Sequence, residues 1–508
     1  MENLAYMLIP FQEPELFLMI AVGVFFGVYI GAIPGLSSTM AISLLVSFTF
    51  GWSTNAALAI MLGIHCGVVY GGSRSAILLN IPGAPAAVAT GFDGYPLAKK
   101  GMAGQALGIT CIASVIGGYL GTIALAIGAP LISNIALKCA PRDYLLLAFM
   151  GLMLVGSLGT KSITRGIISA VIGVTIGMVG MDPISGQGRY TFGNVYLMAG
   201  IDYVPAMLGL FGVSEVLEQL MDRDLPAIKQ KLDRIIPSVS TVVKHMPLIL
   251  RSSVIGVLVG AMPGAGGDIS ALIAYDQAKR TTKNPEVPFG EGAIEGIIAP
   301  ETANNATIGG VFIPMLTLGI PGDAVSAVMI GALTIHGLKP GPMLMSDTPH
   351  LFYLMVMALL IANFFLIIFG LTGIRIFAKL VEIPKGILFP IIVILTVVGS
   401  YAINNSLYDI FWMIGFGILG YFLKRFDYPT APAVLGIILA ELIETNFRRA
   451  IIIEGTIPSL LLSFVTNPIS LVLLLIIVIM FVTQSQKYKA FRAKRDEKKA
   501  AEKAQKKS

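Results

Sequence analysis

Hydrophobic residues lie along this chain in long continuous runs rather than in short alternating segments. A helix that crosses a lipid bilayer needs about 20 mostly apolar residues. Runs that approach this length occupy 15–33, 104–127, 143–159, 162–180, 247–262, 351–373, 387–402, 407–423 and 468–483. The strands of a transmembrane β-barrel would instead alternate apolar and polar residues. The pattern therefore predicts an all-α polytopic membrane protein.

Other apolar runs are shorter and interrupted. They cover 36–50, 56–71, 74–81, 291–300, 308–319 and 323–335, and Pro-Gly pairs stand at 34–35, 82–83, 263–264 and 321–322. With both kinds counted, we expect about 12 crossings, some of which turn back within the membrane. A broken helix is tolerated in lipid only where protein buries it or water lines it, which makes the Pro-Gly points candidate cavity-lining sites. Simple kinks and small-residue packing are the alternative.

Two motifs recur in the same order, which indicates an internal duplication. Residues 27–36 read GVYIGAIPGL and residues 256–265 read GVLVGAMPGA, with six of ten positions identical. Residues 70–83, YGGSRSAILLNIPG, align with residues 309–322, GGVFIPMLTLGIPG, and both end in Leu-x-Ile-Pro-Gly. Paired broken segments in matching places are a sequence pointer to the binding site of a transporter.

The repeats divide the chain into parts. We expect a first repeat half at 1–220 with motifs at 27–50 and 70–100, a cytoplasmic connection at 221–245, a second repeat core at 246–345 with motifs at 256–275 and 299–342, C-terminal transmembrane helices at 346–486, and a basic cytoplasmic tail at 487–508.

Charged residues are scarce and unevenly placed. They make up 13% of the chain, against about 25% in soluble domains. This excludes a cytosolic enzyme, a nucleic-acid-binding protein and a disordered chain. Residues 487–508 hold ten Lys or Arg and three Asp or Glu, whereas the net charge of the whole chain is +6. The basic balance therefore belongs to the tail.

The basic residues also predict how the two repeats are oriented. No Lys or Arg precedes Arg74, whereas residues 221–251 hold six. Cytoplasmic loops are enriched in Lys and Arg, so the first helix is expected to enter from outside and its counterpart from the cytoplasm, giving inverted repeats. Cysteines introduced at positions 5 and 235 should then react with an impermeant thiol reagent from opposite sides. Labelling of both from one side would contradict the inversion.

Short polar residues follow the Pro-Gly pairs. Ser37, Ser38 and Thr39 follow the first pair, and Asp268 follows the third. Such residues cap a new helix, and a helix N-terminus inside the membrane attracts anions through its dipole and its N–H groups. We expect Ser37, Ser38 and Thr39 to contact a substrate carboxylate. The alternative is that these hydroxyls only cap their own helices.

Arg74 stands within an apolar region. A buried arginine in a membrane segment is rare and marks a candidate functional site, and its guanidinium suits a carboxylate. We expect Arg74 to contact substrate. The alternatives are that it reaches the membrane interface or pairs with Asp93.

The second half carries the densest polar cluster, APETANNATIGG at 299–310. Its amide and hydroxyl groups suit a sodium ion or substrate carboxylates. We expect Asn304, Asn305 and Thr307 to contact substrate and Thr302 to serve ion coupling. A loop at the membrane surface is the alternative.

Further candidates lie beside the repeat motifs. Asn80 precedes the second Pro-Gly pair and is expected to contact substrate, while Gly83 and Gly322 would let the backbone approach it. Asp268 and Asp323 each follow a motif. An acidic residue repels an anion unless a cation lies between them, so these two are expected to couple an ion. They could alternatively cap helices.

Catalytic and metal signatures are missing from the sequence. The four histidines show no HExxH spacing, and no G-x-S-x-G motif occurs. The three cysteines give no metal-ligand spacing. An intramembrane aspartyl protease would match AGGD at 265–268 only superficially. We expect no enzyme and no cofactor or metal beyond a possible Na⁺.

Several motifs together resemble the large membrane subunit of the tripartite tricarboxylate transporters, the TctA-type family. They are GAIPGLSSTMAISLL, YGGSRSAILLNIPG, FDGYPLAKKG, GAMPGAGGDISALIAY, APETANNATIGG and LTLGIPGDAVSAVMIGALTIHGLKPGP, and the resemblance covers roughly residues 15 to 460. The family pattern usually has a small or apolar residue at Arg74, and Thr or Ser at Asp268. These departures put a tricarboxylate cargo in question.

The resemblance implies a permease of the bacterial inner membrane. It would work with a small four-helix membrane subunit of the TctB type and a periplasmic substrate-binding protein of the TctC type. Transport would be secondary and driven by an ion gradient, with Na⁺ favoured over H⁺, and citrate or a related organic acid would be the cargo. The alternative is a self-sufficient transporter or channel for another solute.

Overall fold

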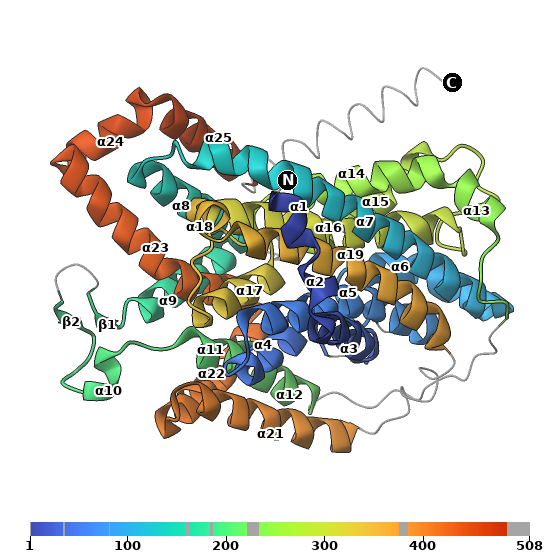
Figure 1. Cartoon of the computed structure of the whole chain (residues 1–508), viewed down its shortest axis with the longest axis horizontal. Helices are drawn as coiled ribbons and strands as arrows, with labels where there is room; N and C mark the ends of the chain where they lie inside the picture. Colours follow the sequence, from blue (N-terminus) through green and yellow to red (C-terminus); the bar gives the residue numbers. More distant parts are fainter. Residues whose placement is uncertain are drawn as a thin grey trace.

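A computed structural model describes residues 2–33, 36–80, 82–157, 163–182, 186–220, 233–374 and 385–484 (Figure 1). These residues are almost entirely helical. The described strands, β1 (Gly180–Met181) and β2 (Gly188–Arg189), form one short antiparallel pair. The protein is an all-α polytopic membrane protein, as the hydrophobic runs predicted.

Six helices of the described residues are long and apolar enough to cross a membrane: Pro14–Gly31, Thr54–Leu79, Ala87–Ala136, Pro349–Thr372, Leu407–Arg425 and Thr430–Glu454. A seventh span arises if Ile457–Thr466 and Pro468–Ile479, bent by 89°, cross together. Shorter apolar helices are Ser38–Thr49, Thr164–Gly177, Met246–Gly260, Ala324–Ile335 and Phe389–Asn404. The estimate of about 12 crossings counted both long and short segments.

The two halves contain the same succession of helices. In the first half these are α3 (Pro14–Gly31), α4 (Ser38–Thr49), α5 (Thr54–Leu79) and α6 (Ala87–Leu97). In the second half they are α14 (Met246–Gly260), α15 (Gly266–Thr281), α16 (Glu295–Leu318) and α17 (Ala324–Ile335). In each half the first helix packs along the third, α3 on α5 and α14 on α16.

Small residues bring these helix pairs together at corresponding places. A Cβ atom added at Gly27 would meet the main chain of Ile64, and one added at Gly256 would meet the main chain of Ala303. Ile64 and Ala303 each stand six residues before the second motif of their half. Gly27 and Gly256 therefore perform the same packing role, as expected for small residues between membrane helices. The duplication read from the sequence is thus repeated in the packing.

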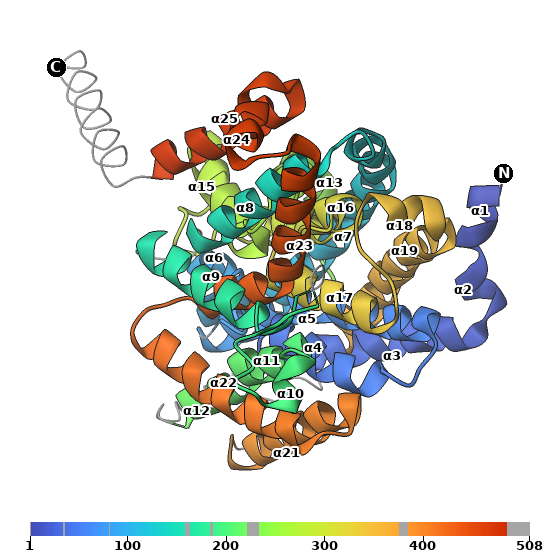
Figure 2. The same ribbon diagram turned by 90° about the vertical axis from the view of Figure 1, so that its left-hand side faces the viewer.

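Two long helices join the repeat cores. Helix α7 (Ala103–Ala136) packs on α16, and α19 (Pro349–Thr372) packs on α5, α3 and α7. A further group of helices comprises α8 (Pro141–Ser157), α9 (Ile163–Gly177), α11 (Tyr203–Met207), α12 (Ser214–Gln219), α21 (Lys385–Asn404), α22 (Leu407–Arg425), α23 (Thr430–Glu454), α24 (Ile457–Thr466) and α25 (Pro468–Gln484). A π-helical turn, η2 (Leu208–Val213), lies between α11 and α12. In both views α21 and α22 lie at one end of the protein and α24 and α25 at the other (Figures 1 and 2).

Short helices complete the described chain: α1 (Glu2–Met7), α2 (Ile9–Gln12), the π-helical turn η1 (Ala98–Met102), α10 (Val195–Met198), α13 (Val239–Lys244) and α18 (Pro342–Asp347).

The structure corrects two expectations about the interrupted runs. The runs 56–71 and 74–81 belong to one continuous helix, α5, and the runs 291–300 and 308–319 belong to one continuous helix, α16. Polar residues in these segments do not end the helices, because they are buried against neighbouring helices instead of facing lipid. In particular, the 299–310 cluster is buried helix and not a surface loop.

Helix α23 was missed by the search for apolar runs. It carries Glu441, Glu444, Arg448 and Arg449, which lower the local hydrophobicity. Glu444 forms ion pairs with Arg189 and Arg448, so much of this charge is neutralised by partners. The first Pro-Gly pair at 34–35, residues 221–232 of the predicted 221–245 connection and the tail at 487–508 lie outside the described residues.

Candidate substrate and ion site

A helix ends within the second motif of each half. The residue directly after α5 is Asn80, which has a left-handed backbone with φ 59°, and the residue directly after α16 is Gly319 with φ 70°. Asn and Gly are the residues that adopt this conformation most readily at a helix C-terminus. Asn80 is exposed, and its N–H donates to the Ala76 carbonyl. The sequence Leu-x-Ile-Pro-Gly therefore ends one helix and turns the chain toward the next.

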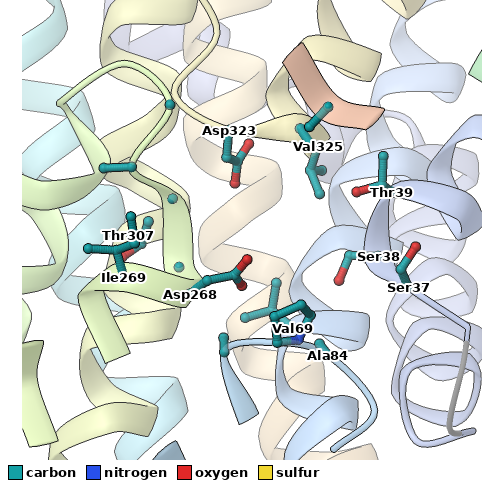
Figure 3. Close-up of a pocket in the computed structure, with 18 of the residues that line it drawn as sticks. Ser37, Ser38, Thr39, Val69, Ala84, Asp268, Ile269, Thr307, Asp323 and Val325 are labelled. Carbon is teal, nitrogen blue, oxygen red and sulfur yellow. The ribbon is translucent and has the colours of Figure 1, made fainter. Parts of the chain in front are cut away.

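The breaks of both halves meet around one cavity of about 380 Å³ (Figure 3). Its lining includes three segments of the first half, around Ser38, His65 and Pro85, and three of the second half, around Asp268, Asn304 and Ala324. The remaining lining comes from Phe211, Glu215, Lys424 and residues 429–432. A cavity built from the broken helices of two repeats is where transporters of this kind hold substrate and ions.

Corresponding residues of the two repeats line the cavity in pairs. His65 of α5 corresponds to Asn304 of α16, because each stands five residues before the second motif. Thr39 corresponds in the same way to Asp268, five residues after the Pro of the first motif. The two halves therefore supply lining residues at corresponding positions, but the side chains at those positions differ in chemistry.

Three helices begin at the cavity. Ser37 caps α4 by accepting from the N–H of Met40 at 3.2 Å. Asp323 caps α17 by accepting from the N–H of Ser326 at 2.7 Å, and the Ser326 hydroxyl accepts from the N–H of Asp323. Helix α15 has Asp268 in its first turn. The capping alternative is therefore observed for Ser37 and Asp323, and both residues also line the cavity.

The two carboxylates lie on one side of the cavity and the hydroxyls on the other. Figure 3 shows Asp268 and Asp323 on one side, facing Ser37, Ser38 and Thr39 across the open space. Asp268 is exposed to this space, and Asp323 is half-buried. A bound carboxylate can be tolerated beside two aspartates only if a cation lies between them.

One cationic side chain of the lining is already paired. Lys424 of α22 donates to Glu215 at 2.5 Å and to Glu218 at 2.9 Å, both on α12. Lys424 and Glu215 both line the cavity. Neither was predicted, because they lie far from the repeat motifs and only the fold brings them to the cavity.

Six predicted residues are not part of the cavity lining: Arg74, Asn80, Gly83, Thr302, Asn305 and Gly322. Thr302 and Asn305 are buried in α16, and the Asn305 side chain donates to the Glu301 carbonyl at 3.0 Å. Added Cβ atoms at Gly83 and Gly322 would meet the main chain of Gly31 and Gly260. These two glycines therefore bring the broken segments against α3 and α14.

Arg74 is fully buried and contacts the end of another helix. Its guanidinium donates to the carbonyls of Gly370 at 2.6 Å and Phe369 at 3.3 Å, at the last turn of α19. It also lies over the ring of Tyr70, 5.0 Å from the centroid. A cation at a helix C-terminus is stabilised by the helix dipole. Asp93 was an alternative partner, but it accepts from Tyr275 and from the N–H groups of residues 290, 292 and 293.

One missed residue had a usable signal in the sequence. His65 is buried at the cavity and is the repeat counterpart of Asn304, so extending the alignment of the second motif by five residues identifies it. Residues 429–432 lie at the start of α23 and follow no repeat motif that was recognised. Among the described residues, no group of three or more His, Cys, Asp or Glu side chains could hold a metal ion.

Comparison with known families decides the family of this chain. The model of the family described as "Tripartite tricarboxylate transporter TctA family" matches residues 17–435. The chain belongs to the TctA family. Its resemblance to this family in the sequence motifs is thereby confirmed, and TctA proteins are components of a transport system.

Similar TctA-related proteins come from Agrobacterium vitis. One, named "Uncharacterized 52.8 kDa protein in TAR-I ttuC' 3'region", is 38% identical over 454 residues, which is 89% of this chain and 90% of that protein. Another, "Uncharacterized protein in TAR-II ttuC' 3'region", is 41% identical over 245 residues, 48% of this chain and 98% of that protein. No solved structure matches this chain.

Proposed function

We propose that this TctA protein is the membrane subunit that carries a carboxylate through the bacterial inner membrane by secondary active transport. The observation that supports this most is the single cavity at which the broken helices of both repeats meet. The N-terminus of α4, at Ser37 and Ser38, offers N–H groups and a positive dipole end to the carboxylate. Asn304 offers its amide group from α16, and Thr307 lines the same cavity with its hydroxyl donating to the Ala303 carbonyl at 2.8 Å.

A cation in the same cavity completes the proposal. Asp268 and Asp323 face the substrate side, where a sodium ion between carboxylate and aspartates would remove their repulsion. Binding of the carboxylate then requires the sodium ion, and this requirement couples the transport of the carboxylate to the transport of sodium. Na⁺ is proposed over H⁺ as the cation inside this cavity, because side-chain oxygens of both repeats surround the space.

The family description names a tripartite system, and it supports two partners. A small TctB-type membrane subunit and a periplasmic TctC-type binding protein would complete the transporter, with the basic tail in the cytoplasm. Uptake of radiolabelled citrate into proteoliposomes that contain all three parts tests this. Accumulation that needs both the binding protein and an inward sodium gradient supports the proposal. Downhill flux that needs neither supports a self-sufficient transporter or channel.

Replacing Asp268 with asparagine is expected to remove the sodium dependence of citrate uptake. The change keeps the size of the side chain and deletes the charge that holds the cation. Initial uptake rates measured over a sodium series should become flat and low. Asp276→Asn on the same helix is the matched control, because Asp276 is exposed and pairs with Arg280 at 2.9 Å, away from the cavity. A wild-type sodium response in the Asp268 variant would remove this residue from ion coupling.

A further inference from the structure

A buried carboxyl group outside the cavity lining has no role in the proposal above. Glu301 lies in the second turn of α16 and is 1% exposed. Both of its oxygens contact hydroxyl groups, Oε1 with Thr90 of α6 at 2.5 Å and Oε2 with Ser114 of α7 at 3.0 Å. Within the described ranges, no Lys, Arg or His forms an ion pair with Glu301.

The titratable groups on neighbouring helices do not compensate a charge on Glu301. Cys111 of α7 is a buried thiol beside it. Arg74 of α5 donates to the carbonyls at the end of α19. Asp93 of α6 accepts a hydrogen bond from the Tyr275 hydroxyl of α15. The cavity lining includes Asp268 of α15 and Asp323. Other titratable groups on these elements are His65, Cys66 and Tyr70 on α5, Tyr95 on α6, Tyr119 on α7, Arg251 on α14, Asp276, Lys279 and Arg280 on α15, Glu295 on α16, His336 after α17 and Asp347 on α18.

An ionised carboxylate in this place would be costly. Moving a lone charge out of water into a low-dielectric interior costs several kcal/mol or more after relaxation. The neutral hydroxyls around it, of Thr90, Ser114 and also Ser73 on α5, offset only part of this. A neutral carboxyl group avoids the cost, and it can donate its own proton to one hydroxyl while accepting from another.

The contacts of Glu301 favour a proton over a metal cation. A sodium ion would have to lie between oxygens that are now in direct contact, at 2.5 and 3.0 Å. A proton needs no such space. Asn305 lies one turn further along α16, and its buried Oδ1 has no hydrogen-bond partner among the described residues. This oxygen can therefore accept a hydrogen bond close to Glu301.

The position of Glu301 links it to the cavity. Asn304, one helical turn away on α16, lines the cavity, and Thr90 is on α6, the helix that follows the cavity-lining residues 84–86. The contact between Glu301 and Thr90 therefore joins two segments, α16 and α6, that both reach the cavity or directly follow its lining. We propose that Glu301 is a proton-binding site, which takes a proton from water on one side of the membrane and returns it on the other as the carboxylate is carried.

Infrared spectroscopy of the full-length protein in lipid nanodiscs tests protonation without any substrate. The wild-type protein at neutral pH is expected to show the carbonyl stretch of a protonated carboxyl group, and Glu301→Gln is expected to lose it. Glu444→Gln is the matched control, because Glu444 is also buried but forms ion pairs with Arg189 and Arg448. An unchanged band in Glu301→Gln, or a band that disappears when Na⁺ is added, overturns the proposal.

Thr90→Val covers the case in which Glu301→Gln does not fold. It removes the hydroxyl that contacts Oε1 and is expected to shift the same carbonyl band. A band that does not move overturns the assignment to Glu301.

The coupling of this proton to transport rests on the function proposed above, and a second measurement separates the two. In proteoliposomes with the binding protein and an inward sodium gradient, Glu301→Gln is expected to keep citrate counterflow but to lose the further accumulation that a pH gradient adds. Persistent pH-driven accumulation in this variant overturns the coupling. Absence of citrate counterflow in the wild-type protein instead contradicts the proposed function, and the infrared result still decides the proton site.

Discussion

Replacing Asn304 with alanine is expected to abolish concentrative uptake of citrate. The Asn304 side chain lies in the cavity at 6% exposure, and its Oδ1 faces Gly267 at the start of α15. It can donate to a carboxylate and accept from a neighbouring donor. A hydrogen bond to a charged group contributes about 1.5–3 kcal/mol, so citrate affinity should fall roughly ten- to a hundredfold. Calorimetric titration and uptake rates measure the two effects.

Asn363→Ala is the matched control for this variant. Asn363 is also a buried asparagine in a membrane helix, and its side chain donates to the Leu359 carbonyl at 2.8 Å. It does not line the cavity. The control is expected to bind citrate as the wild-type protein does. Wild-type affinity in Asn304→Ala would exclude the amide from the substrate site.

Replacing Gly322 with alanine is expected to destabilise the folded protein strongly. The added Cβ would lie 2.7 Å from the Cα of Val311 and 2.8 Å from the carbonyl oxygen of Gly260. Both neighbours belong to rigid helices, so neither can move aside cheaply. Overpacking of this kind costs about 1–3 kcal/mol. The midpoint of thermal unfolding, measured in one detergent, should fall.

The repeat predicts the same result at Gly83. There an added Cβ would lie 2.8 Å from the Ser75 hydroxyl and 2.9 Å from the Cα of Gly72. Gly415→Ala in α22 is the control, because no atom lies within 4 Å of the added Cβ and alanine favours a helix by about 1 kcal/mol over glycine. The midpoint of thermal unfolding of Gly415→Ala should stay the same or rise. Equal midpoints for all three variants would contradict the packing role of Gly83 and Gly322.

Much of the cavity follows from the repeat motifs. The sequence placed Ser37, Asp268 and Asp323 after the Pro-Gly pairs of the repeats and Asn304 in the polar cluster at 299–310, and the fold brings all four to one cavity. Their convergence has a simple cause: helices that break inside the membrane must face protein or water, and two related breaks can satisfy each other. Arg74 was singled out because it stands in an apolar run, and the structure shows it buried.

The partner of a buried polar group, however, does not follow from its own sequence neighbourhood. Arg74 contacts carbonyls at the end of α19, almost three hundred positions along the chain. Lys424 meets Glu215 over a similarly long separation. Glu301 was only one polar residue among several in its cluster until α6 and α7 were seen to place hydroxyls on it.

The sequence by itself determined the membrane class, the duplication and the points at which helices break, because length, apolar content and Pro-Gly pairs act locally along the chain. Only the tertiary structure decided which polar side chains share the cavity and which ones serve packing. It showed that α5 and α16 are continuous helices. It also showed that Gly83 and Gly322 lie in close helix contacts and that Glu301 lies beside Thr90 and Ser114. The physical reason is that a buried polar group takes its role from the neighbours that compensate it, and those neighbours come from distant parts of the chain.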